Sequence, residues 1–305
     1  QRQMCIRDSP NTLYIGTEHH VFVSTNRGGN WAKLNAPTTA YDDIVVHPRE
    51  HDLVLGTHGR SIWIVDDVRA LGEFGDTPST AAHLYSIGLG TIKSYWKDTS
   101  YRGQAEFHGT NPRDGVEISY SLGDGTGSAR LLIENTRGDV VRELAVPSSS
   151  GVHRVNWDLR HSLGEGPDTW QDVDTSVLPR PDEERGPFVS PGVYRVALEA
   201  RGTRSTTTLT VRADPELDLT DAHYRAREAF LVGLLGMRRE IRRQAGAGTG
   251  QGCRGLSGDL GSACQIVSRV YDNLNGEGIR PGSMYGPTAQ DRAQVARARA
   301  LMEGR

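Results

Sequence analysis

The sequence has no run of apolar residues close to the roughly 20 that a membrane-spanning helix needs, so we predict no membrane span. It also lacks an excess of either charge, because 35 basic and 38 acidic residues leave a net charge of −3. This balance gives no general electrostatic attraction to nucleic acid or anionic lipid, and neither is predicted as a partner. With 36% hydrophobic residues among 305, the chain is long enough for two or three domains with cores.

Motifs for several kinds of catalytic and cofactor site are missing. The sequence has no P-loop, no dinucleotide-binding fingerprint and no serine-nucleophile motif, so we predict no cofactor. No histidine pair has the helical spacing of a zinc protease, and no Cys-x-x-Cys pair is present. We therefore predict no metal site.

Cysteine is sparse, with Cys5, Cys253 and Cys264 the full complement. The last two flank a glycine-rich loop that would let them approach each other. A disulfide requires their Cα atoms to lie within about 7 Å. The sequence alone leaves a disulfide and two free thiols equally open.

Residues 1–9 do not share the pattern that follows. They begin Gln-Arg-Gln-Met-Cys and contain no apolar core or cleavage pattern of a signal peptide. We interpret them as a non-native leader and exclude them from the predicted fold. The lack of a signal peptide then carries no information about localisation.

Residues 10–75 contain short strand-like segments separated by turn signals. Near-regular spacing of short strands is typical of a β-propeller or a β-sandwich rather than of alternating strands and helices. The predicted strands are 13–16, 20–24, 31–34, 43–47, 53–57 and 61–65.

The turn between the second and third of these strands has the pattern of an Asp box. Asparagine can bond nearby backbone N–H groups, and glycine supplies the positive φ of a tight corner. The tryptophan is expected to start the next strand and bury its ring against a neighbour. We predict a structural rather than a catalytic role for the four residues of the Asp box: Ser24, Asn26, Gly28 and Trp31.

Together with this turn, the segments 13–17, 45–48 and 55–67 resemble the last blades of sortilin-type β-propellers. Bacterial members of that group are often named glycosyl hydrolases with neuraminidase-type (BNR) repeats. The resemblance implies that the chain is the C-terminal part of such a protein and that it is secreted or periplasmic. It also implies further blades upstream, since a closed propeller needs about four to eight blades of four strands.

Residues 76–103 show little periodicity of apolar residues and are interpreted as a connector. Between 104 and 214, apolar and polar residues alternate, as at Val116, Ile118 and Tyr120. Seven strand candidates predict an immunoglobulin- or fibronectin-like β-sandwich, with no helix before residue 200 and no parallel pairing.

From residue 215 to 305 the apolar period becomes helical, and we predict a module of three amphipathic helices. Thr220 or Asp221 is the expected N-cap of the first helix, and Gly276 ends the second. Thr288, with Asp291 three residues later, is a variant capping box for the third. The arginines at 238–243 are expected on a solvated face.

Four residues near the end of the first region form a candidate ligand-binding loop: His58, Arg60, Asp66 and Asp67. The tripeptide 58–60 occupies a loop between strands, where a propeller presents ligand-binding groups. Its alternative interpretation is a tight turn in which Arg60 is held by Asp66 or Asp67. Adjacent carboxylates on an extended segment point to opposite faces, so this pair does not form a hydrolytic site.

Two functions follow from these patterns. We favour a non-catalytic binding or scaffolding role, with a peptide, a glycan or a partner protein as ligand. The alternative is a sialidase-like glycoside hydrolase whose active site lies mainly in the upstream blades. An arginine cluster with a tyrosine–glutamate pair in those blades would indicate the hydrolase.

Overall fold

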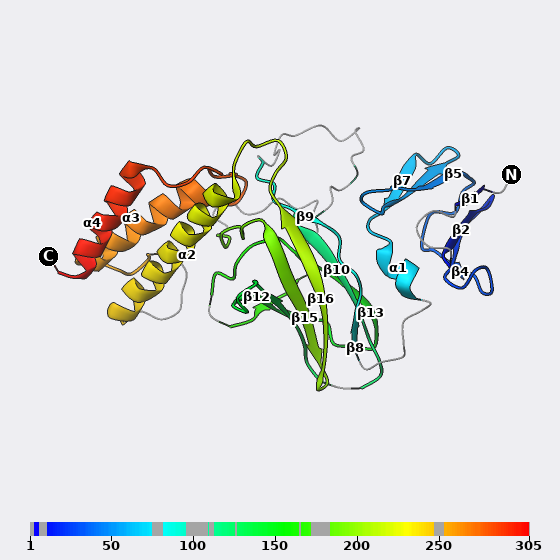
Figure 1. Ribbon diagram of the computed structural model, residues 1–305, viewed down its shortest axis with the longest axis horizontal. Coiled ribbons are helices and arrows are strands. Elements are labelled where there is room, and N and C mark those ends of the chain that lie inside the picture. The colour runs from blue at the N-terminus through cyan, green and yellow to red at the C-terminus, as the bar shows by residue number, and fades with distance from the viewer. Residues whose placement is uncertain are drawn as a thin grey trace.

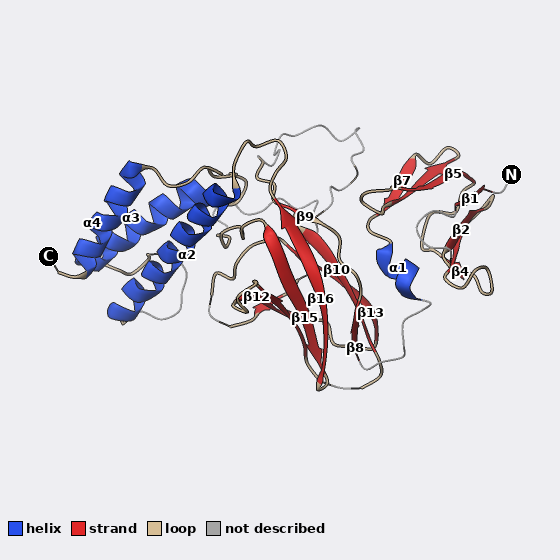
Figure 2. Cartoon of the chain, in the orientation of Figure 1, coloured by secondary structure: helices blue, strands red, loops and turns tan. Residues whose placement is uncertain are grey.

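The computed structural model describes residues 3–5, 11–74, 82–95, 109, 113–125, 127–164, 166–171, 184–246 and 253–304. The chain is mainly β, and the strands are followed by helices near the C-terminal end (Figure 1). Figure 2 shows the first strands at one end of the molecule, the longest strands in the middle and the long helices at the other end. The prediction of a mainly β chain with a helical C-terminal part is therefore confirmed.

The first strands form two small antiparallel sheets, β1-β2-β3-β4 and β5-β6-β7. Every second residue is buried along β2, and three residues are buried along β5, whose register shifts between Tyr41 and Asp43. The two sheets share a core that includes Tyr14, Ile44 and Leu53. The strands are β1 (Gln3–Cys5), β2 (Leu13–Gly16), β3 (Val21–Ser24), β4 (Ala32–Lys33), β5 (Tyr41–Val46), β6 (Leu53–Thr57) and β7 (Ile62–Val65).

The N-terminal residues depart from one expectation. β1 pairs with β2 in antiparallel register, with Gln3 opposite Gly16. Excluding residues 1–9 from the fold was therefore wrong for residues 3–5. The pairing is made by backbone groups, so it needs no apolar pattern in the side chains.

Two larger sheets occupy the middle of the chain, with the orders β13-β10-β8 and β14-β12-β11-β15-β16-β9. Their strands are β8 (Ala82–Leu84), β9 (Gly90–Thr91), β10 (Val116–Leu122), β11 (Ala129–Glu134), β12 (Val140–Val146), β13 (Gly151–Trp157), β14 (Asp168–Thr169), β15 (Gly192–Ala200) and β16 (Thr203–Arg212).

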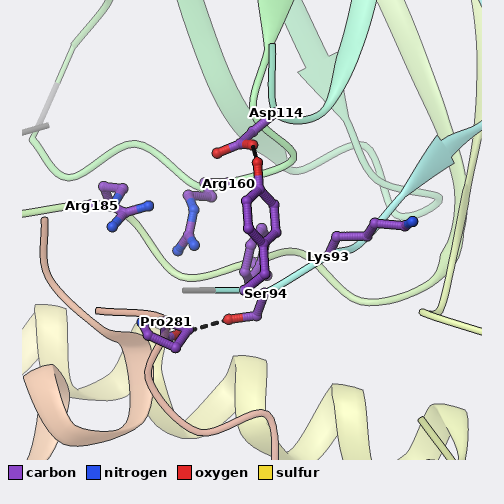
Figure 3. Close-up of a pocket in the computed structure, with 8 residues that line it drawn as sticks. Lys93, Ser94, Asp114, Arg160, Arg185 and Pro281 are labelled. Atoms are coloured by element: carbon purple, nitrogen blue, oxygen red, sulfur yellow. Dashed lines mark hydrogen bonds between the residues drawn. The ribbon is translucent and has the colours of Figure 1, made fainter. Parts of the chain in front are cut away.

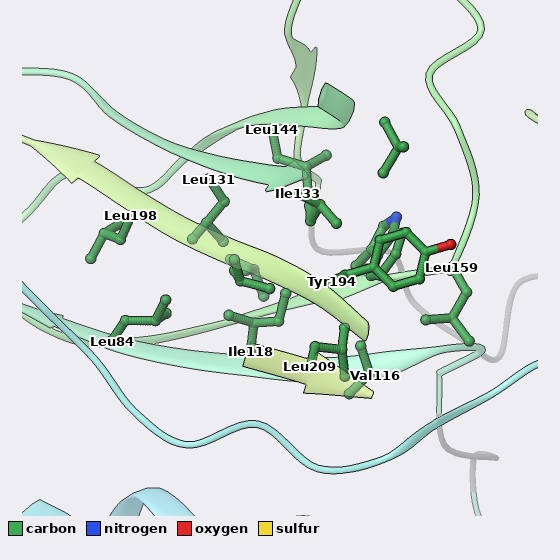
Figure 4. Close-up of a cluster of buried hydrophobic side chains, with 14 of the residues drawn as sticks. Leu84, Val116, Ile118, Leu131, Ile133, Leu144, Leu159, Tyr194, Leu198 and Leu209 are labelled. Atoms are coloured by element: carbon green, nitrogen blue, oxygen red, sulfur yellow. The ribbon is translucent and has the colours of Figure 1, made fainter. Parts of the chain in front are cut away.

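Both middle sheets contribute side chains to one hydrophobic cluster. Every second residue of β10 is buried, as the period of two predicts. Figure 4 shows Ile118, Leu131 and Leu209, which come from three different strands, gathered in this core.

Three short elements contradict the predicted pattern. Helix α1 (Arg69–Phe74) lies well before residue 200. β9 pairs in parallel with β16, and β14 pairs in parallel with β12, so the expectation of purely antiparallel pairing was also wrong. Each of these strands is two residues long, which is too short for an apolar period to be detected. The segment 76–103, interpreted as a connector, supplies β8 and β9.

The C-terminal helices are α2 (Asp221–Gln244), α3 (Gly258–Asn275) and α4 (Ala289–Met302). Thr220 is the N-cap of α2, and Gly276, with φ at +77°, follows the last residue of α3. Thr288 and Asp291 form a capping box at the start of α4. Apolar residues of the helices meet in a core of their own.

A disulfide joins Cys253 to Cys264, with the two Cα atoms 5.7 Å apart. It ties the loop before α3 to a residue inside that helix. Of the two alternatives that the sequence left open, a disulfide or two free thiols, the structure contains the disulfide.

Candidate functional site

The Asp-box turn connects β3 to β4 through a network of short-range hydrogen bonds. The Ser24 hydroxyl accepts from the backbone N–H of Gly28 at 2.8 Å and donates to the Asn26 side-chain oxygen at 3.0 Å. That same oxygen accepts from the backbone N–H of Asn30 at 2.8 Å. Gly28 has φ at +88°, a conformation that side chains disfavour. These contacts close the hairpin and account for the polar residues of the turn.

Trp31 differs from its expected role. Its side chain is 39% exposed, so the expectation of a buried ring was wrong. The ring lies against Gly28, where a Cβ would be 3.6 Å from ring atom Cζ2. The physical reason is that β4 has two residues, both exposed, so this strand provides no buried side chain against which the ring could pack.

The four residues of the candidate ligand-binding loop separate into two pairs at opposite ends of β7. His58 and Arg60 lie in the hairpin before this strand, and the exposed His58 ring is 3.2 Å from the Asp42 carboxylate. Asp66 and Asp67 follow the strand. Four strand residues span about 13 Å, so the structure does not bring the two pairs together.

The aspartates after β7 bind basic residues other than Arg60. The Asp67 carboxylate forms an ion pair of 2.7 Å with Arg69. The main-chain carbonyls of Asp66 and Asp67 each accept a 2.8 Å hydrogen bond from the Arg154 guanidinium on β13. Burial, with added repulsion from Asp52, raises the pKa of the Asp66 carboxyl above its usual value. This pair therefore links the first region to the middle sheets.

β7 itself is an apolar strand at the edge of its sheet. Its only hydrogen-bonded neighbour among the described strands is β6. Ile62, Trp63 and Ile64 are 67%, 45% and 57% exposed. Large apolar side chains gathered on a free edge are typical of a surface that contacts another polypeptide.

A second candidate site is a hollow where the middle sheets meet the helical region (Figure 3). The space inside it is about 20 Å³. Basic, hydroxyl and aromatic side chains gather there from segments far apart in the sequence. The lining residues are Lys93, Ser94, Tyr95, Asp114, Arg160, Arg185, Phe188 and Pro281.

Arg160 is the deepest charged residue of this hollow, at 4% exposure. Its Nη1 donates to the Gly186 carbonyl at 2.7 Å and to the Asn275 side-chain oxygen at 3.2 Å. Its guanidinium lies 3.5 Å from the centre of the Phe188 ring. Burial lowers the pKa of Arg160 to about 10, and the nearby Arg185 acts in the same direction. The group thus remains charged at neutral pH.

Arg185 reaches the hollow from the loop before β15. Its Nη2 donates to the Gly278 carbonyl, while its buried Nε has no hydrogen-bond partner. Its own carbonyl accepts from the Tyr271 hydroxyl at 2.6 Å and from the Asn275 amide at 2.7 Å. The loop is therefore anchored to α3 by its backbone, which fixes the position of the side chain.

Ser190, Glu228 and His161 form a polar chain near the hollow. Glu228 is 2.6 Å from the His161 Nε2 and accepts a 3.0 Å bond from the Ser190 N–H as well as a bond from its hydroxyl. In a catalytic triad the histidine stands between serine and carboxylate, whereas here the carboxylate stands between the other two. Burial opposes ionisation, yet these hydrogen bonds hold the pKa of Glu228 below its usual value. The arrangement fits a structural tie between α2 and the loops.

Sequence reasoning identified neither this hollow nor the apolar edge of β7. The lining residues are spread from 93 to 281 and form no motif, so the sequence contained no local signal for them. The three successive apolar residues of β7 were the available signal for an exposed strand. Within the described ranges, no cluster of metal-binding side chains occurs, and no helix combines the length and apolar character of a membrane span.

Comparisons with known proteins give no family. No protein-family model and no curated protein matches the chain. One similar solved structure is a biofilm-associated protein BSP domain, with 9% identity and a TM-score of 0.21, covering 71% of this chain and 30% of the other. Another is the extracellular domain of a one-component system from B. thetaiotaomicron, with 11% identity and a TM-score of 0.19, covering 71% of this chain and 26% of the other. The chain thus spans less than a third of either protein, and neither likeness bears on fold or function.

Proposed function

We propose that the chain is a non-catalytic binding or scaffolding part of an exported protein, and that its ligand is a protein segment in extended conformation. On this proposal the first two sheets are the last blades of a sortilin-like β-propeller, and β7 accepts the ligand by adding a strand to its sheet. The observation that carries it is the exposed apolar edge of β7.

The hydrogen-bond register of the hairpin supports this role for β7. Thr57 N–H donates to the Ser61 carbonyl, and Trp63 lies opposite Leu55 two residues further along. Because hydrogen-bonded pairs alternate in an antiparallel ladder, the backbone groups of Ile62 and Ile64 point away from β6. They would be available to an added strand.

The disulfide supports the proposal that the protein is exported, because disulfides are typical of proteins in an oxidising compartment.

Contacts in the middle region support the predicted immunoglobulin-like sandwich. The Tyr194 hydroxyl donates to the Ser190 carbonyl at 2.7 Å, and its ring packs edge-on against the buried Trp157 at 5.8 Å. A buried tryptophan and a tyrosine bonded to backbone upstream are typical of immunoglobulin-like sandwiches.

Peptide binding provides the test. We would select binders from a displayed peptide library on the purified chain and compare wild type with Ile64→Pro and Ile64→Thr. Proline removes the outward N–H without disturbing the bonds to β6, whereas threonine keeps it. Binding lost in I64P and kept in I64T is expected; equal binding by both variants would contradict strand addition.

An enzymatic assay separates the proposal from the hydrolase alternative. The same preparation would be assayed on a panel of sialosides and other glycosides, with Asp66→Asn and Asp67→Asn alongside. We expect no turnover above the uncatalysed rate. Turnover that disappears in either variant would favour the hydrolase.

A further inference from the structure

We propose that the hollow between the middle sheets and the helices binds a compact oxyanion, a carboxylate, sulfate or phosphate group, through the guanidinium groups of Arg160 and Arg185. This inference does not depend on the proposed role of β7, since the two surfaces belong to different elements. The oxyanion can be free or carried by a small organic ligand.

The hollow has an excess of positive charge. Its lining includes three cationic side chains and one carboxylate, that of Asp114. Asp114 accepts a 2.6 Å hydrogen bond from the Tyr95 hydroxyl. Glu184, the next carboxylate along the loop, is paired with Arg238 at 2.6 Å. Within the described part of the chain, neither Arg160 nor Arg185 forms an ion pair with a carboxylate. Asp158 attracts Arg160 without an ion pair, so much of the charge of the two arginines is left for a ligand.

Both guanidinium groups have N–H donors without an acceptor. Nη1 of Arg160 donates to two neutral oxygens, and no described residue accepts a hydrogen bond from its Nε or Nη2. The Nε of Arg185 is buried without a partner. A buried donor left unpaired is costly, and a charged donor more so. An oxyanion would accept from both guanidinium groups in short, charge-assisted bonds.

The shape of the hollow also suits an oxyanion. Figure 3 shows the Arg160 and Arg185 side chains near each other, in agreement with the repulsion that Arg185 exerts on Arg160. The space inside the hollow is about 20 Å³, slightly more than a single buried water needs. It suits a compact oxyanion whose organic carrier, if there is one, stays outside the hollow.

Calorimetric titration of the whole chain provides the test. Sulfate, phosphate and acetate would be titrated separately, with sodium chloride balancing ionic strength. We expect saturable binding of one anion per chain. Arg185→Met should weaken it by about tenfold or more, because it removes a charge and the fork of donors. Arg137→Met removes the same charge from an exposed side chain outside the hollow, in the turn between β11 and β12, and should weaken binding by less than about threefold.

Several outcomes would overturn the proposal. Absence of saturable binding by wild type is the first. Equal losses in R185M and R137M would indicate general attraction to surface charge. Circular dichroism checks folding, and Arg185→Lys replaces R185M if that variant unfolds; unchanged affinity in R185K would contradict recognition by the guanidinium fork. Glucuronate should bind and glucose should not, and equal binding of both would exclude an oxyanion site.

Discussion

Arg227 on α2 donates a 2.8 Å hydrogen bond from Nη2 to the main-chain carbonyl of Leu274 at the end of α3. Its Nε donates to the Ser283 carbonyl at 2.9 Å, on the segment that leads to α4. The residue is 2% exposed, and burial lowers its pKa to about 10. One buried cation with neutral partners thus holds three segments of the helical region together.

Arg227→Met should lower the free energy of unfolding by about 2–4 kcal/mol, because two buried carbonyls lose a charged donor. Urea denaturation followed by circular dichroism would measure the change. A variant as stable as wild type would mean that the cost of burying the guanidinium outweighs its two bonds.

Reducing the Cys253–Cys264 disulfide should destabilise the chain by about 2–3 kcal/mol, given the 11-residue separation of the two cysteines. Thiol titration under denaturing conditions should find one thiol per chain before reduction and three after it, since the sequence has three cysteines. The double variant Cys253→Ala/Cys264→Ala serves as control, because reductant should leave its melting temperature unchanged.

Asp272→Asn should stabilise the chain at neutral pH. Burial, followed by repulsion from Glu277, raises the pKa of Asp272 from 3.8 to about 6. The folded state therefore binds more protons than the unfolded state between these values, and stability falls as pH rises through this window. The gain in D272N should be near zero at about pH 4 and about 1–2 kcal/mol above pH 7, after allowance for partial exposure.

Denaturant titrations at several pH values would follow this gain. Asp259→Asn is the matched change at the other end of α3, where a negative charge in the first turn is favourable. It should give no gain at any pH. A gain in D272N that does not depend on pH would contradict the assigned cause.

Arg154→Met should loosen the link between the end of β7 and β13. The two carbonyls that Arg154 contacts lose their charged donor, and Glu117 on β10 loses an ion pair of 3.6 Å. We expect faster hydrogen exchange in residues 66–74 with unchanged exchange in β15 and β16. A uniform increase over the whole chain would instead indicate global destabilisation.

Two tryptophans should differ strongly when truncated. Trp157 is 1% exposed and Trp31 is 39% exposed. Trp157→Ala should cost about 3–5 kcal/mol, whereas Trp31→Ala should cost about 1 kcal/mol, because less of the ring leaves a packed environment. Chemical denaturation of both variants measures the difference, and similar losses would mean that Trp31 packs more tightly than its exposure indicates.

The three C-terminal helices and most strands could be predicted because their signals are local. An apolar period and a terminal glycine identify α3, and Thr288 with Asp291 marks the start of α4. Alternation along β10 likewise matches its burial. Each of these signals is contained within the element itself.

The remaining features depend on residues distant in sequence. The arginines at 238–243 were expected on a solvated face, yet Arg238 is buried and pairs with Glu184. The charge of a helix residue does not reveal which loop will pack on it. The basic hollow could not be predicted for the same reason, since Arg160 and Arg185 meet only after the sheets and helices assemble.

The parallel pairing of β9 with β16 has a consequence for synthesis of the chain. Gly90 lies opposite Val211, and Leu84 on the neighbouring segment donates to Ser205 across 121 residues. At roughly 5–20 residues per second, ribosomes make this intervening stretch in about 6–24 s. Strand β9 therefore leaves the ribosome well before its partner β16, and a chaperone has that interval in which to bind it.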